Sequence, residues 1–181
     1  DLHLSRGLGD VYKRQESVYK ATNKLNISAN ISFSENKNVD YKTNYNGVIT
    51  DWGDTDISFS PNVISSAGIQ FNASQDLTFA LLNKFVGNQY MSNTESNISK
   101  LSSYSTTDLN ILYTIKNSAY FSEIIFTAMI NNIFNKEYVS NGYYYTYDDT
   151  WSDPNLITTI EGTGYYPQAK RNFLLGLTFK L

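Results

Sequence analysis

Apolar and polar residues alternate along much of this chain with a period of two. Between residues 25 and 34, every odd position is apolar and every even position carries a hydroxyl or an amide. Successive side chains of a β-strand point to opposite faces, so this stretch predicts a strand with one apolar and one polar face. The same pattern ends the chain, where every second position is apolar: Phe173, Leu175, Leu177, Phe179 and Leu181.

Six strands of this kind are predicted, and the connections between them differ in length. The strands are expected at residues 25–34, 57–73, 77–90, 102–116, 120–138 and 165–181. Turns at 74–76 and 116–118 are short, whereas the polar connections at 36–56, 92–101 and 140–164 are long. Short turns on one rim and long loops on the other are typical of outer-membrane β-barrels. Several strands also reach the roughly 9–11 residues that a tilted strand needs to cross lipid.

Composition fits this interpretation and removes several others. A mean hydropathy of -0.37 is too polar for membrane helices but suits barrel strands, which are apolar only at alternate positions. The chain of 181 residues has a net charge of -3 and no basic stripe, so no nucleic-acid partner is expected. It contains no cysteine, and its single histidine lies near the N-terminal end. No catalytic arrangement, metal site or cofactor is therefore predicted, and we do not expect an enzyme.

Residues 1–15 differ from the rest, because they are rich in charge and do not alternate. Residues 5–15 resemble a translated sequencing-adapter remnant, so 1–15 are predicted to be a non-native or disordered leader. A mobile arm or the end of a strand is the alternative. The start lacks the apolar segment of a secretory signal, and about six strands cannot close even a small barrel of about eight. Residues 16–181 are therefore expected to be part of a longer barrel.

Four stretches, in order and suitably spaced, resemble the C-terminal portion of TonB-dependent outer-membrane receptors of the kind abundant in Bacteroidota. They are Lys84–Met91, Tyr104 with Asp108 and Leu109, Asn132–Asn135 with Tyr138 and 141–143, and Tyr166–Phe173. In the third stretch Ile133 stands where the family usually has Leu. The resemblance covers about residues 16–181.

The resemblance implies a fold, a location and partners. It implies that these strands form the C-terminal part of a roughly 22-stranded barrel in the bacterial outer membrane, incomplete in this chain. Such receptors import a scarce nutrient, such as an iron chelate, haem, cobalamin or an oligosaccharide, with energy supplied through TonB. The implied partners are outer-membrane lipid, an upstream plug and barrel, and the TonB complex, which is contacted through that upstream part.

The last strand resembles the signal read by the barrel assembly machinery, a further implied partner. Gly176, Phe179 and the terminal apolar residue have the expected spacing, although the family usually ends in Phe and this chain ends in Leu181. Phe173, Leu175 and Leu177 complete the strand that is expected to close the barrel.

Aromatic residues in the long connections are candidates for contact with a substrate. Tyr143, Tyr144, Tyr145 and Trp151 lie in the longest connection, and Trp52 lies in the first. Tyrosine and tryptophan rings stack on sugars or chelates. The alternative is that the loop packs on its neighbours or extends the barrel wall. Two acidic clusters, at 51–56 and 148–153, do not match a calcium-loop pattern and are interpreted as solvated loop faces.

A second hypothesis is a soluble, lectin-like β-sandwich that binds ligands through its aromatic residues. A third is a small complete barrel. In a sandwich the odd positions from Leu25 to Phe33 would face a second sheet across a dry core. In a membrane barrel the same positions form an exposed apolar band.

Overall fold

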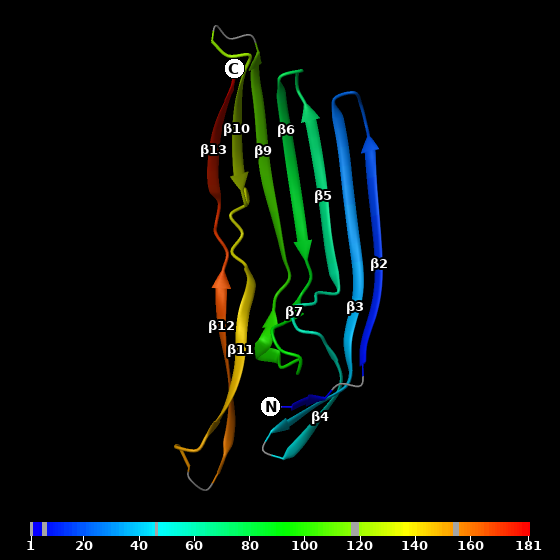
Figure 1. Ribbon diagram of the computed structural model, residues 1–181, viewed down its shortest axis with the longest axis vertical. Coiled ribbons are helices and arrows are strands. Elements are labelled where there is room, and N and C mark those ends of the chain that lie inside the picture. Colours follow the sequence, from blue (N-terminus) through cyan, green and yellow to red (C-terminus); the bar gives the residue numbers. More distant parts are fainter. Residues whose placement is uncertain (1, 5–6, 46, 117–119, 154–155) are drawn as a thin grey trace.

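The chain forms a single-layered antiparallel sheet in a computed structural model that describes residues 2–4, 7–45, 47–116, 120–153 and 156–181 (Figure 1). Within these ranges, side chains are described for residues 11 onward. No helix in these ranges has the length and apolar character needed to span a membrane.

The wall of the molecule consists of long strands, each hydrogen-bonded to the next in the order β2-β3-β5-β6-β9-β10-β13. Their bounds are Gly7–Lys20 for β2, Leu25–Tyr45 for β3, Val63–Asn72 for β5, Leu77–Val86 for β6, Tyr104–Lys116 for β9, Glu123–Asn131 for β10 and Asn172–Lys180 for β13. Two further strands, β1 (Leu2–Leu4) and β4 (Val48–Asp56), also pair with β3. The fold class predicted from the alternation is confirmed: the protein is all-β and antiparallel.

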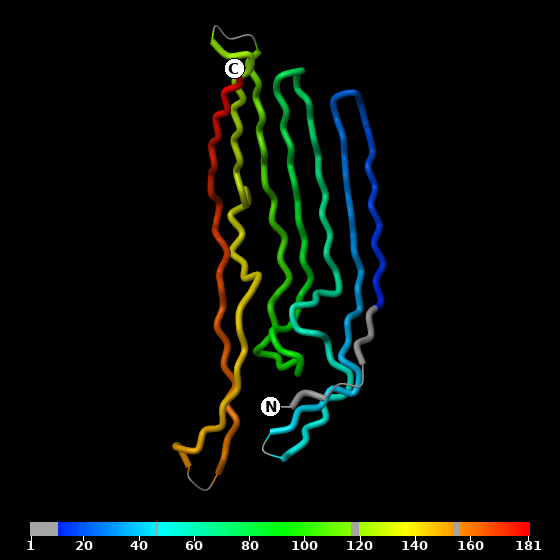
Figure 2. The backbone as a smooth tube through the Cα atoms, in the orientation of Figure 1, coloured from blue at the N-terminus to red at the C-terminus, as the bar shows by residue number. Residues whose placement is uncertain are grey.

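The sheet does not close on itself. Among the described residues, β2 pairs only with β3, and β13 pairs only with β10. These two strands lie at opposite edges of the wall (Figure 2). The open sheet agrees with the prediction of an incomplete barrel.

One face of the wall is largely apolar from β3 to β13, and Tyr19 extends it onto β2. Directly opposite residues in an antiparallel pair lie on the same face, so the register defines rows that cross the sheet. One row contains Tyr19, Ile27, Ile69, Leu81, Leu109, Ile130 and Phe173. The next contains Leu25, Phe71, Phe79, Ile111, Ala128 and Leu175. No second sheet covers these rows in the described part of the chain, and Ile27, Ile69 and Phe71 remain substantially exposed.

The opposite face is largely polar. One row of this face contains Glu16, Asn30, Ser66, Lys84 and Thr106. The row from Asn26 to Leu174 is mixed and includes Ala80 and Met129. Side chains of this face bond to one another across strands. The Asn30 amide donates to Ser66 Oγ at 2.7 Å, and Lys180 Nζ pairs with Glu123 at 2.6 Å. Within each strand the faces thus divide by alternate positions as predicted: the apolar face holds the even positions of β10 and the odd positions of the other strands, and it is uncovered.

The connections sort by length, also as predicted. Short turns join β2 to β3 and β5 to β6 at one end of the wall, the upper end in Figure 1. At the other end, which we call the loop end, β3 continues into a hairpin with β4, and β11 (Val139–Asp149) pairs with β12 (Thr158–Pro167). Between these hairpins lie β7 (Gln89–Tyr90), the 3₁₀ turn η1 (Asn97–Ser99) and β8 (Lys100–Leu101).

Several observed boundaries differ from those predicted. The connections expected at 36–56 and 140–164 are mostly strand, because β3 runs on to Tyr45 and β11 and β12 form a second hairpin. The strand expected from residue 57 begins at Val63, after Pro61, since proline cannot donate a ladder hydrogen bond. The strand expected to continue to 138 ends at Asn131, where Asn132 takes a φ of 52°. The predicted turn at 116–118 lies mostly outside the described residues.

The leader proposed for 1–15 is partly a strand. Residues 7–20 pair with β3 in continuous register, from Gly7 opposite Val39 to Lys20 opposite Asn26. The described residues 7–15 therefore belong to an edge strand. Whether 1–15 are native or adapter-derived stays a prediction.

Candidate functional site

The loop end contains most of the tight packing of the molecule. Within the described ranges the buried apolar side chains are Tyr41, Val86, Met91 and Leu101. Tyr41 belongs to the β3–β4 hairpin, and Met91 and Leu101 flank residues 92–99, a segment we call the central segment. Because the wall is one layer thick, a packed cluster forms only where these connections fold against one another.

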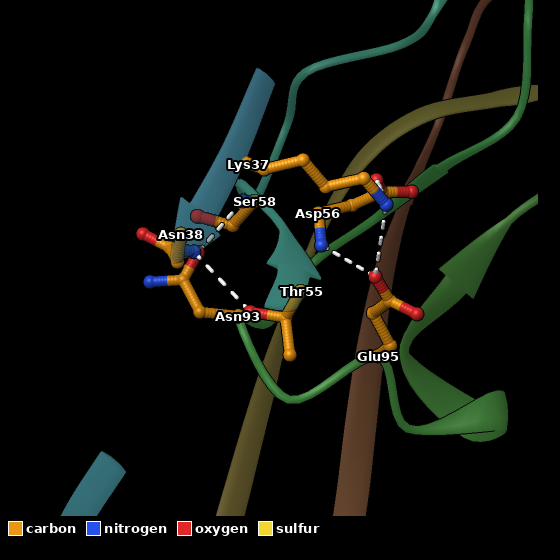
Figure 3. Close-up of polar contacts among 7 residues, drawn as sticks. All are labelled: Lys37, Asn38, Thr55, Asp56, Ser58, Asn93 and Glu95. Carbon is orange, nitrogen blue, oxygen red and sulfur yellow. Dashed lines mark hydrogen bonds and ion pairs between the residues drawn. The ribbon is translucent and has the colours of Figure 1, made fainter. Parts of the chain in front are cut away.

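The central segment is bonded to the β3–β4 hairpin through charged and amide groups (Figure 3). Lys37 Nζ lies 2.7 Å from Asp56 Oδ1 and 3.9 Å from Glu95 Oε1. The Asp56 backbone N–H donates to the same Glu95 oxygen. The Ser58 backbone N–H donates to Asn93 Oδ1 at 2.7 Å. The Glu95 carboxylate therefore accepts a hydrogen bond from the Asp56 backbone and also attracts the Lys37 ammonium.

The opposite side of the central segment is bonded to the β11–β12 hairpin. Ser96 Oγ donates to Glu161 Oε2 at 3.0 Å, and the Tyr144 hydroxyl donates to Glu161 Oε1. The Tyr165 hydroxyl donates to the Ile98 carbonyl at 3.4 Å. Glu161 thus accepts one hydrogen bond from the central segment and one from β11.

Two of the donors in these contacts, Lys37 and Tyr144, have raised pKa values. The hydrogen bond to Asp56 is the largest cause that raises the pKa of Lys37 above 10.5, with the carboxylates of Asp56 and Glu95 adding to it against partial burial. Burial, followed by the hydrogen bond to Glu161, raises the pKa of Tyr144 above 10.0. Both groups stay protonated at neutral pH, which keeps their donor hydrogens in place.

The tyrosines predicted as candidates for substrate contact divide between the two faces of the β11–β12 hairpin. Tyr143 and Tyr145 share a face, with ring centroids 6.2 Å apart, whereas Tyr144 points to the other. Across the ladder, Tyr143 and Tyr145 are opposite Gly164 and Gly162. Each ring occupies the space over its glycine: an added Cβ would lie 2.3 Å from the nearest ring carbon. The absence of a side chain on these glycines lets the rings lie against the backbone.

The two tryptophans lie apart from this set. Trp52 is on β4, and its Nε1 donates to Thr43 Oγ1 at 3.0 Å within the β3–β4 hairpin. Trp151 follows β11 and is 92% exposed. The structure therefore places the candidates on two separate hairpins, and it does not assemble them into one pocket.

The predicted closing strand corresponds to β13. Phe173, Leu175, Leu177 and Phe179 lie on the apolar face of the wall, and Leu181 follows the strand. Gly176 lies on the other face, opposite Thr127, where an added Cβ would be 3.6 Å from Thr127 Cβ. The role of this strand in closure and assembly stays a prediction.

The acidic clusters are engaged locally. Asp51 pairs with Lys42, which lowers the pKa of the Asp51 carboxyl, and Asp149 accepts from Ser152 Oγ at 2.5 Å. Across the described ranges, no three His, Asp or Glu side chains come together as a group that could hold a metal ion.

The cross-links made by Lys37, Glu95 and Ser96 were not found from the sequence. Each is an ordinary polar residue in an irregular or long connection, and its partner is distant in the chain: Ser96 and Glu161 are 65 positions apart. The one available signal was the polarity of residues 92–99 between two apolar strands, which does not identify a partner.

Comparison with solved structures identifies receptors with the same fold. The siderophore receptor PiuA from Acinetobacter baumannii matches over 95% of this chain and 22% of that chain, with 15% identity and a TM-score of 0.72. The ferric-catecholate import receptor Fiu from E. coli K12, in its closed form, matches over 93% of this chain and 27% of that chain, with 12% identity and a TM-score of 0.52.

These matches show a shared fold, and this chain spans about a quarter of the length of the receptors. No protein-family model matches the sequence. No curated protein matches it either.

Proposed function

We propose that this chain forms part of the wall of an outer-membrane transporter that imports a scarce nutrient with energy supplied through TonB. The supporting observation is the uncovered apolar face, continuous over seven strands in the row from Tyr19 to Phe173. Large exposed apolar surfaces are rare on soluble monomers, and a face of this extent calls for lipid or a partner. The polar, hydrogen-bonded opposite face suits a wet lumen.

The soluble β-sandwich is the weaker hypothesis. It requires a second sheet against the odd positions of β3, yet Phe33 is 49% exposed and Ile27 is 37% exposed. The hairpins and short strands of the loop end lie beyond the apolar rows (Figure 1).

We infer that the cargo is an iron chelate. The support is that both matched receptors are named for siderophore or ferric-catecholate import. Haem, cobalamin and oligosaccharides are the alternative cargoes. The partners in this proposal are outer-membrane lipid, a plug and further barrel strands, the TonB complex and the barrel assembly machinery.

The proposed candidates for cargo contact are the exposed rings of the two hairpins, Trp52, Tyr143, Tyr145 and Trp151. Tyr144 suits this role less well, because its hydroxyl is bonded to Glu161. Only two tryptophans occur in the chain, so quenching of their fluorescence by a ferric chelate reports directly on Trp52 and Trp151.

Uptake in the bacterium that encodes the chain tests the proposal. Deleting the gene is expected to abolish accumulation of radiolabelled ferric siderophore under iron limitation, and a protonophore is expected to do the same in the parent strain. Unchanged uptake of every ferric chelate, haem, cobalamin and oligosaccharide tried would contradict transport. Recovery of the protein in the soluble fraction would contradict the outer-membrane location.

A further inference from the structure

The central segment, Ser92–Ser99, touches both loop-end hairpins through neighbouring residues. Glu95 bonds to the Asp56 backbone and lies near Lys37, on the β3–β4 side. Ser96, the next residue, donates to Glu161 of β12. These two contacts leave the segment toward different elements, although only one peptide bond separates the residues.

The backbone of the segment is shaped to make this arrangement possible. Glu95 adopts a φ of 52°, a left-handed conformation that is uncommon for a residue with a side chain. Such conformations persist only where the surrounding contacts hold them. At Glu95 the holding contacts are the bonds to Asp56 and Lys37.

Internal hydrogen bonds make the segment a compact unit. Ser99 is fully buried, and its hydroxyl donates to the Ser96 carbonyl at 2.7 Å. Ser92 Oγ donates to Ser99 Oγ at 3.0 Å, and the Met91 N–H donates to the Ser99 carbonyl at 2.8 Å. A displacement of one end of the segment is therefore passed to the other end instead of being absorbed within it.

We propose that Ser92–Ser99 is a brace that couples the β3–β4 and β11–β12 hairpins, so that the two hairpins move as one unit. The coupling runs from Lys37 and Asp56 through Glu95 and Ser96 to Glu161. It rests on contacts within the chain and does not depend on which cargo the protein carries. Coupled sites respond to each other's perturbation, and this reciprocity is the property to measure.

Hydrogen–deuterium exchange on the full chain in detergent micelles tests the coupling from either side. Glu95→Ala cuts only contacts to the β3–β4 hairpin, yet it is expected to speed exchange in the β11–β12 hairpin as well. Ser96→Ala cuts only contacts to the β11–β12 hairpin, to Glu161 and Tyr144, and is expected to speed exchange in the β3–β4 hairpin. Glu16→Ala, an exposed acidic position on β2 that pairs with Arg14, is the matched control and is expected to leave both hairpins unchanged.

Each contrary result overturns the brace. If each variant speeds exchange only in the hairpin it directly contacts, the hairpins are independent. If exchange also accelerates in β5 and β6, the segment holds the wall together and is not a coupling element.

A distance measurement provides a second readout. The chain has no cysteine, so spin labels at Ile49→Cys and Thr158→Cys report on the two hairpins alone. Both positions are exposed. The interlabel distance distribution is expected to broaden when Glu95→Ala and Ser96→Ala are combined, and an unchanged distribution would overturn the proposal.

Discussion

Lys37 is the residue whose charge most directly ties the loop-end contacts together. The pKa of Lys37 is raised above 10.5 in the folded chain, so its pairing with the ionised carboxylates of Asp56 and Glu95 stabilises the structure at neutral pH. This stabilisation is lost as the pH rises through the raised pKa. We expect the Lys37 Cε signal of a ¹³C-lysine-labelled sample to titrate at higher pH in the folded chain than in urea. A midpoint at or below the unfolded one would show that the Asp56 contact is weak.

Gly142 is a residue at which even one methyl group has no room. An added Cβ would lie 2.4 Å from the Gly164 carbonyl oxygen and 2.6 Å from Met91 Sδ. Because a backbone atom blocks the space, Gly142→Ala is expected to cost about 1–3 kcal/mol, seen as faster amide exchange in β11–β12. Gly176→Ala is the control, since its nearest neighbour is at 3.6 Å. Equal exchange in the two variants would contradict this packing.

The sequence predicts which face of a strand a residue occupies, but it does not predict which distant residue that side chain contacts. The alternation along β3 predicts that Ile27 lies on the apolar face, because strand geometry alone sends successive side chains to opposite faces. No local rule connects Glu95 to Lys37, which is 58 positions earlier in the chain. Nor does one show that Tyr144 turns away from Tyr143 and Tyr145, until the loop is known to be a strand.

At the scale of elements, the strands with regular alternation were the best predicted. The strands β5, β6, β9, β10 and β13 all lie within the ranges expected from the sequence. The loop-end half of β3, with both hairpins, was not anticipated, since polar side chains on both faces erase the period-2 signal. Strand pairing there depends on backbone hydrogen bonds and on the turn, and the hydropathy pattern carries no information about either.

Adjacent leucines on β13 allow the two faces of one strand to be compared. Leu175 lies on the apolar face opposite Ala128, and Leu174 lies on the polar face opposite Met129. Leu175→Lys is expected to cost about 2–4 kcal/mol near the centre of a bilayer, whereas Leu174→Lys is expected to cost much less. The measurement is the fraction of protein that floats with lipid vesicles and resists protease. Equal losses for both variants would contradict the assignment of faces.

At the scale of the whole molecule, the apolar band crosses the ladder rows obliquely. Its centre lies near Ala29 in β3 and near Leu177 in β13, a shift of about six residues, or about 20 Å, across five strand spacings of about 4.8 Å. If the band lies in the plane of a membrane, the strands tilt by about 40°, within the range of closed barrels.

Polarised infrared spectroscopy of aligned bilayers checks this tilt. The amide I dichroism is expected to correspond to about 40° from the bilayer normal. Strands aligned with the normal, or lying in the membrane plane, would show that the apolar band is not a membrane band.

The central claim is that the apolar face of the wall, which holds the odd positions of every strand except β10, meets hydrocarbon and that the opposite face meets water. A spin-label scan of β5, one cysteine at a time from Val63 to Asn72 in lipid bilayers, tests it most directly, because the chain has no other cysteine. Oxygen accessibility is expected to peak at odd positions such as Ile69 and Phe71, and accessibility to a water-soluble nickel chelate at even positions such as Gln70. Odd positions that neither reagent reaches would be enclosed by protein, and the account of a membrane wall would be wrong.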